Sequence, residues 1–154
     1  MDTRHRFTRA FQMHSRRVPS DEAELREAMR RFVSVRRSRI PAEQDPLAVL
    51  EREGFDAHFF GGTVRDVALN GSWVRPRDID VVVSGVDEDK LQKALARWIV
   101  QSTRFGGFRL QTGYEVLDVW PTHRTWAFRE FPLIGSEAGE LPRTTPFTIE
   151  AAVV

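Results

Sequence analysis

The residues best suited to chemistry in this sequence are two aspartates that stand two positions apart in an apolar run. Asp78 and Asp80 belong to segment 77–83 (RDIDVVV), whose β-branched residues predict a buried strand. Side chains alternate along a strand, so both carboxylates project from the same face and repel each other unless a cation neutralises them. The pair therefore indicates a site for Mg²⁺, or for Mn²⁺ in its place. The alternative is an exposed strand mouth, where both acids pair with Arg75 and Arg77.

A glycine-rich turn precedes this strand in the sequence GGTVRD, which begins at Gly61. Gly61 and Gly62 follow a short apolar run and precede a helical pattern, which predicts a strand-to-helix turn. Paired glycines let backbone N–H groups approach a ligand, and the helix N-terminus that follows favours an anion. Arg65 adds a positive charge one turn into the helix. The turn therefore indicates a phosphate site, and the alternative is a tight turn with Arg65 and Asp66 as surface charges.

Taken together, the phosphate-binding turn and the acid pair on the next strand predict a nucleoside-triphosphate site. In this order they resemble the head domain of the tRNA nucleotidyltransferase (CCA-adding) and bacterial poly(A) polymerase family, within the DNA polymerase beta superfamily. The resemblance is strong over 57–83 and loose over 84–120, and the tail at 147–151 (FTIEA) is similar to the family's Phe-Thr-Ile-Asn-Ala stretch. In that family, helical domains after the head select the base and hold the tRNA. The chain is interpreted either as a minimal relative or as a fragment that works with a partner.

The resemblance implies an α+β fold of the polymerase-beta nucleotidyltransferase type, a short mixed sheet flanked by helices. It also implies Mg²⁺-dependent transfer of an NMP from an NTP to an acceptor hydroxyl, with release of pyrophosphate. The acceptor is expected to be RNA, such as a tRNA 3′ end, a protein hydroxyl or a small molecule. Two rival interpretations remain: a nucleotide- or nucleic-acid-binding module of the same fold without catalysis, and a glycosyltransferase of the DxD type.

Within the resemblance, Asp78 and Asp80 would hold the metal ions, and a third carboxylate would come from a neighbouring strand. The candidates are Asp118 and Glu115. Alternation along the predicted strand puts them on opposite faces, and we favour Asp118, which lies in the β-branched run VLDVW. The alternative for Asp118 is an edge-strand acid that pairs with Arg109 or Arg124.

The remaining site residues follow from the turn. Gly61, Gly62, Thr63 and Arg65 are expected to hold the triphosphate, and Asp66 is expected to orient Arg65 or to contact the ribose. Outside the two motifs, Trp73 is the aromatic residue we consider for stacking on a base, because it lies in a polar loop.

The elements that must position these residues can be read from the periodicity of apolar residues. The sequence predicts, in chain order, a helix over 20–33 capped by Ser20, a short helix over 45–54, a buried strand over 57–60 with His58 inside, a helix over 63–69, a strand over 78–83, a helix over 87–99 capped by Asp87, a hairpin of strands 107–111 and 114–120, and a terminal strand over 147–154.

Length and composition limit the remaining classes. The chain has 154 residues, of which 41% are hydrophobic and 29% charged, with a formal net charge of +1 and no cysteine. Disulfide frameworks and thiol nucleophiles are thereby excluded, and no apolar run approaches the roughly 20 residues that cross a bilayer. Residues 1–40 carry eleven arginines against five acids, so we expect an irregular basic arm over 1–19 and one head-like domain over 20–154. We expect a cytoplasmic protein without a membrane partner.

Overall fold

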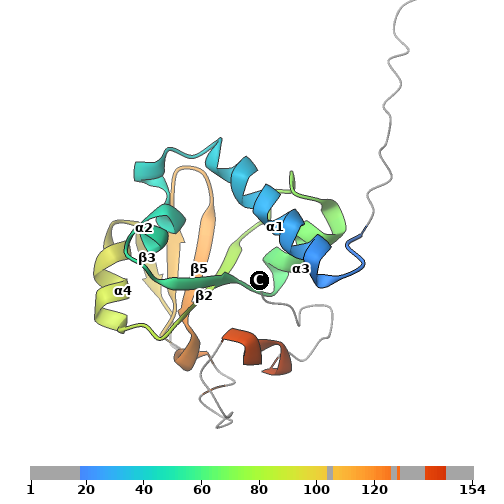
Figure 1. Ribbon diagram of the computed structural model, residues 1–154. Helices are drawn as coiled ribbons and strands as arrows, with labels where there is room; N and C mark the ends of the chain where they lie inside the picture. The colour runs from blue at the N-terminus through green and yellow to red at the C-terminus, as the bar shows by residue number, and fades with distance from the viewer. Residues whose placement is uncertain (1–17, 104–105, 126–127, 129–137, 145–154) are drawn as a thin grey trace, which may run out of the picture.

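The computed structural model describes residues 18–103, 106–125, 128 and 138–144, and it has the expected α+β architecture (Figure 1). Its helices and strands are α1 (Glu22–Arg37), η1 (Ala42–Gln44), α2 (Pro46–Arg52), β1 (Asp56–Phe59), α3 (Gly62–Asn70), β2 (Ile79–Ser84), α4 (Glu88–Leu95), η2 (Ala96–Trp98), β3 (Ile99–Ser102), β4 (Phe108–Gln111), β5 (Val116–Pro121), η3 (Thr122–Arg124) and η4 (Ala138–Thr144), where η denotes a 3₁₀ helix.

The five strands form one mixed sheet in the order β1-β2-β5-β4-β3. Strands β2 and β5 run parallel, and the other three neighbouring pairs run antiparallel. The predicted hairpin is confirmed, because β4 and β5 pair directly around the turn at Thr112 and Gly113. This order puts β2, which carries Asp80 and directly follows Asp78, beside β5, which carries Asp118.

The two faces of the sheet are covered differently. On one face, alternate residues of β2 and β5 pack with apolar residues of α1, α2, α3 and α4 in the main core. On the other face, Val82 and Trp120 pack with Ala138 and Leu141 of η4 in a smaller cluster. Figure 1 shows α1 and η4 on opposite sides of the sheet. The face toward η4 also carries the polar residues of β2 and β5.

Local sequence signals account for the helix starts. Asp87 caps α4 as predicted, with its carboxylate accepting from the N–H of Lys90. Asp45 caps α2 and Pro46 follows at the first helical position, as predicted. The cap of α1 was misplaced by one residue, because Asp21 accepts from the N–H of Glu24. Ser20, the expected cap, instead donates to the Glu24 carboxylate from its own N–H and hydroxyl.

Two predicted elements are present but each differs from the prediction in one respect. The strand predicted over 57–60 forms as β1 but is not buried: Asp56 and Ala57 are exposed, His58 pairs with Asp56 at 2.9 Å, and β1 is at the edge of the sheet formed by the described strands. The helix predicted over 87–99 ends at Leu95, and the chain continues through η2 into β3, which pairs with β4.

Two predicted segments lie outside the described residues, namely the terminal strand over 147–154 and nearly all of the basic arm over 1–19. Among the described residues, none of the helices combines the length and apolar character needed to span a membrane.

Candidate functional site

The glycine turn and Asp80 are held together by two hydrogen bonds. The backbone N–H of Asp80 donates to Oγ1 of Thr63 at 2.8 Å, and its carbonyl accepts from the N–H of Phe60 at 3.1 Å. Gly61 has a φ of +59°, a conformation that L side chains rarely adopt, which explains a glycine at the start of α3. A β-carbon on Gly62 would stand 3.3 Å from Oδ2 of Asp80. The Asp80 carboxylate therefore lies directly over the turn.

Thr63 itself is completely buried, and its hydroxyl is used to hold the backbone of Asp80. Arg65 reaches back toward the turn, because its Nη2 lies 3.5 Å from the position that a β-carbon on Gly62 would take. Asp66 accepts from Nε and Nη2 of Arg65 at 3.0 and 2.9 Å. Asp66 thus orients Arg65, one of the two roles expected for it.

The sheet register brings Asp80 and Asp118 side by side. They are direct partners on the parallel strands β2 and β5, and Arg109 of β4 is the partner of Asp118 on its other side. Residues that pair across strands share a face, so all three side chains lie on the face toward η4. Arg109 contacts Asp118 at 3.3 Å and Asp78 at 3.1 Å. We call Asp78, Asp80, Asp118 and Arg109 the acid cluster.

Asp118 is not an edge-strand acid, because β5 is the central strand of the sheet. It nevertheless pairs with Arg109, one of the two arginines named in the alternative interpretation. Burial raises the pKa of the Asp118 carboxyl; Arg109 opposes this rise and the charge of Asp78 adds to it. A carboxylate with a raised pKa is a better proton acceptor than one in open solvent.

The donor chemistry of the acid cluster fits a hard divalent cation. Asp80 and Asp118 present carboxylate oxygens from neighbouring strands, and Mg²⁺ commonly takes one or two carboxylates together with phosphate oxygens. Among the described residues, however, no three carboxylate or imidazole groups converge as a ready metal-binding set. Arg109 supplies the neutralising charge between Asp78 and Asp118. Its guanidinium must shift before Asp78 and Asp118 can both face a metal ion.

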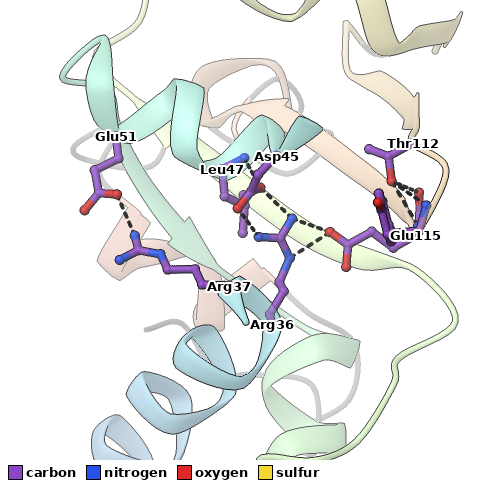
Figure 2. Close-up of polar contacts among 8 residues, drawn as sticks. Arg36, Arg37, Asp45, Leu47, Glu51, Thr112 and Glu115 are labelled. Atoms are coloured by element: carbon purple, nitrogen blue, oxygen red, sulfur yellow. Dashed lines mark hydrogen bonds and ion pairs between the residues drawn. The ribbon is translucent and has the colours of Figure 1, made fainter. Parts of the chain in front are cut away.

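Glu115, the other candidate for the third carboxylate, belongs to a different cluster (Figure 2). It accepts from Nε of Arg36 at 2.7 Å and makes a second contact with Nη2. The same guanidinium donates to both oxygens of Asp45, at 2.7 and 2.6 Å. We call Arg36, Asp45 and Glu115 the buried network. It joins α1 and the cap of α2 to the β4–β5 turn, away from the face that carries Asp118.

Sequence reasoning named every member of the acid cluster but missed the contact between Arg109 and Asp78, and it missed the buried network entirely. Arg109 was considered only as a surface partner of Asp118, and the strand alternation that placed Asp118 also predicts the position of Arg109 across the hairpin. The buried network has no such signal, since Arg36 and Glu115 are 79 positions apart. An arginine in the last turn of an amphipathic helix is ordinarily expected to face solvent or the helix dipole.

Comparisons with known proteins point to the same class of protein as the geometry of the site, the nucleotidyltransferases. No family model matches the chain, and no curated protein matches its sequence. Solved structures that are similar to it include two nucleotidyltransferases. One is a tRNA nucleotidyltransferase complexed with a primer tRNA and an incoming ATP analogue, with 27% identity and a TM-score of 0.50. The other is a CCA-adding enzyme in complex with CTP, with 18% identity and a TM-score of 0.53, a likeness of fold alone.

The matches cover 71% and 82% of this chain but only 30% of each solved chain. The chain therefore spans less than a third of the length of either protein. Both solved structures are nucleotidyltransferases, and the five-stranded mixed sheet with its helices is consistent with a nucleotidyltransferase fold. The chain thus has a polymerase-beta-type nucleotidyltransferase fold and resembles the head domain of the CCA-adding tRNA nucleotidyltransferases.

Proposed function

We propose that the chain carries the catalytic site of a metal-dependent nucleotidyltransferase that moves an NMP from an NTP to an acceptor hydroxyl. The observation that carries this proposal is the position of the Asp80 carboxylate over the Gly61–Gly62 turn, with Asp118 as its neighbour across the sheet. A site for the triphosphate and a site for the cation that accompanies it are thereby adjacent. The resemblance to two solved nucleotidyltransferases supports the same reaction class.

In this proposal each part of the site has a separate task. The N–H groups at the start of α3 bind the triphosphate, because the first amides of a helix lack partners within it. Arg65, oriented by Asp66, contributes a charge-assisted contact to the same phosphates. The Thr63 hydroxyl already accepts a hydrogen bond from the N–H of Asp80 and so holds Asp80 in place. Thr63 therefore offers its backbone amide to the phosphates.

Asp78, Asp80 and Asp118 would hold Mg²⁺, or Mn²⁺, which when bound stabilises the attacking and leaving oxygens of an in-line displacement. Asp118 would also accept a hydrogen bond from the acceptor hydroxyl and take its proton as that oxygen attacks. The hydroxyl oxygen forms a bond to the α-phosphorus as the bond between that phosphorus and the bridging oxygen breaks. Pyrophosphate leaves with the electron pair of the broken bond.

The reaction is tested with ATP and with the other three NTPs, each labelled at the α-phosphate, together with Mg²⁺ and cellular RNA or protein. We expect label in one acceptor fraction and pyrophosphate in solution. Asp80→Asn should reduce the rate at least about 10³-fold, because ions in such sites contribute several kcal/mol to the barrier. Equal circular dichroism spectra of the two proteins would exclude unfolding as the cause. Turnover of a nucleotide sugar in place of an NTP would contradict the proposal and favour a glycosyltransferase.

A binding module without catalysis is the second candidate, and the position of Arg109 favours it. Its guanidinium already neutralises Asp78 and Asp118, as a metal ion would. Tight NTP binding without release of pyrophosphate in any acceptor fraction would select this alternative.

A further inference from the structure

Backbone groups along the outer edge of β1 have no partner among the described residues. The strand lies at the end of the sheet, with β2 as its described neighbour. Phe60, the residue after β1, donates from its N–H to the carbonyl of Asp80 on β2 at 3.1 Å. Backbone groups of successive strand residues point to alternate sides, so His58 also faces β2, whereas the N–H and C=O groups of Ala57 and Phe59 face away from it. Such an edge is a template for a further strand.

The space beside this edge is open on the side of α1. A groove of about 510 Å³ lies between α1 and β1, lined by Ala57 and Phe59 of the strand and by Val33 of the helix. A second groove, of about 530 Å³, is lined by all four residues of β1 and by Leu50 of α2. The described side chains of α1 and α2 therefore leave the edge of β1 accessible to another chain.

The side chains of β1 complement those of a second copy of the same strand. In an antiparallel pair with Ala57 opposite Ala57 of the second copy, Asp56 lies opposite His58 in both halves, and Phe55 lies opposite Phe59. Opposite side chains in a pair that is not hydrogen-bonded are close together, and a carboxylate opposite an imidazole stabilises the pair. Asp56 and His58 are available for this contact, because their side chains are 68% and 33% exposed and their present contact at 2.9 Å is within one strand.

The charges also disfavour the neighbouring registers. A shift that keeps the outward backbone groups opposite each other moves the two-fold axis by one residue along the strand. It then places either two Asp56 carboxylates or two His58 imidazoles opposite each other, and like groups in that position do not stabilise a strand pair. The register centred on Ala57 is therefore the one in which the charged side chains attract.

We propose that β1 pairs antiparallel with β1 of a second copy of this chain, with Ala57 on the two-fold axis, and thereby joins the two sheets into one. Each Ala57 N–H donates to the Ala57 carbonyl of the other copy, and each Phe59 N–H donates to the other Phe55 carbonyl. The N–H of Phe55 takes no part, because it donates to the carbonyl of Leu50 at 2.9 Å. The proposal does not depend on the proposed transfer reaction, since neither the glycine turn nor the acid cluster contributes to the interface.

The first test measures self-association of the whole chain by analytical ultracentrifugation, from about 10 µM to about 1 mM because an interface this small is weak. We expect a concentration-dependent equilibrium between monomer and dimer. Ala57→Pro removes the outward N–H without removing a bond to β2, and an edge position of this kind tolerates proline. It should raise the Kd of the dimer at least about tenfold. Ala57→Ser keeps the N–H and is the matched control, which should leave the Kd unchanged. Equal circular dichroism spectra of the three proteins establish that the fold is retained.

The register is tested by exchanging the two charged residues. His58→Asp puts a carboxylate opposite Asp56 of the other copy, so the Kd should rise about fivefold or more. The double variant Asp56→His/His58→Asp restores the attraction in the register centred on Ala57, so its Kd should return to within about twofold of wild type. In a register centred on His58 the exchange would leave two carboxylates opposite each other, and the Kd would stay raised.

Hydrogen exchange of the Ala57 and Phe59 amides separates a second copy from other occupants of the edge. We expect the protection of both amides to increase with protein concentration. Equal protection at all concentrations would show that a segment of the same chain, such as the strand predicted over 147–154, covers the edge, and it would overturn the proposal. A protein that stays monomeric up to about 1 mM, or a Kd that Ala57→Pro leaves unchanged, would overturn it as well.

Discussion

The acid cluster and the buried network both combine arginine with carboxylates, and both draw residues from the β4–β5 hairpin. They differ in burial and in the contacts that the arginine makes. In the buried network, the side chains of Arg36 and Asp45 are 4% and 2% exposed, and the guanidinium contacts both carboxylates of the network. In the acid cluster, Arg109 is 40% exposed and reaches Asp78 and Asp118 with one nitrogen.

From this difference we interpret the buried network as structural, and we propose the acid cluster as the functional site. A buried guanidinium that is fully used by two carboxylates fixes the elements that supply them, and it has little left to offer a ligand. Arg109 is partly exposed and is shared between Asp78 and Asp118, and Arg77, which is 92% exposed, also pairs with Asp78. These cations are held less firmly than Arg36, so a metal ion or a substrate can displace them from the carboxylates.

The largest effect on stability is expected when the central arginine of the buried network is removed. Arg36→Ala leaves the buried Asp45 and the half-buried Glu115 without the cation that neutralises them, so we expect the free energy of unfolding to fall by about 3–5 kcal/mol. Arg37→Ala is the matched control, because its pair with Glu51 is exposed and should contribute less than about 1 kcal/mol. Urea denaturation followed by circular dichroism measures both values. Equal losses in the two variants would contradict the structural role of the network.

A second variant tests the link between the glycine turn and Asp80. Thr63→Val keeps the volume of the side chain but leaves the Asp80 N–H without its acceptor, so unfolding should become easier by about 1–3 kcal/mol. Because Asp80 is then less firmly positioned, the transfer rate per folded molecule should fall as well. Thr63→Ser keeps the hydroxyl and should retain that rate, which distinguishes the hydrogen bond from packing.

The acid cluster is tested by removing Arg109. Arg109→Gln takes away a positive charge that competes with metal ions for Asp78 and Asp118, so the Kd for Mn²⁺ should fall by about fivefold, the size of one half-exposed ion pair. Arg52→Gln is the control, because Arg52 at the end of α2 pairs with Glu53 and lies outside the acid cluster, so it should leave the Kd unchanged. Titration of free Mn²⁺ by electron paramagnetic resonance gives both constants. Weaker Mn²⁺ binding in Arg109→Gln would show that Arg109 supports the metal site.

The smallest effect concerns pH. Burial raises the pKa of Glu115, and although Arg36 opposes this rise, Asp45 adds to it. At pH values between the ordinary pKa of 4.5 and the raised pKa, Glu115 is protonated in a larger fraction of folded molecules than of unfolded ones. The contribution of Glu115 to stability is therefore largest below this window and declines as pH rises through it. Glu115→Gln should flatten the decline when unfolding free energies are measured from about pH 4 to about pH 7.

Features of the fold and the site could be predicted where the residues that determine them lie close together in the sequence. The turn at Gly61 and the strand after Asp78 followed from glycine placement and β-branched residues, and alternation put Asp118 and Glu115 on opposite faces; the geometry agrees with all three. These signals lie within a few residues of the feature they predict. That a carboxylate from a neighbouring strand joins the acid pair was implied by the family resemblance. The roles of these residues in catalysis remain predictions.

Features that depend on distant partners could not be predicted in the same way. The segment after Leu95 has helical periodicity, but pairing with β4 draws Ile99–Ser102 into the sheet. The apolar run at 57–60 suggested a buried strand, whereas nothing pairs with β1 beyond β2 among the described strands. Arg36 is buried only because Asp45 and Glu115 meet it there.

The most direct test compares the two carboxylates of the hairpin, Asp118 and Glu115, in one assay. Transfer of α-phosphate label from ATP is measured per folded molecule for Asp118→Asn, Glu115→Gln and the wild-type protein. The account predicts a loss of at least about 10²-fold for Asp118→Asn and a rate within about threefold of wild type for Glu115→Gln. The reverse order, or equal rates in both variants, would contradict the assignment of the acid cluster as the site of nucleotidyl transfer.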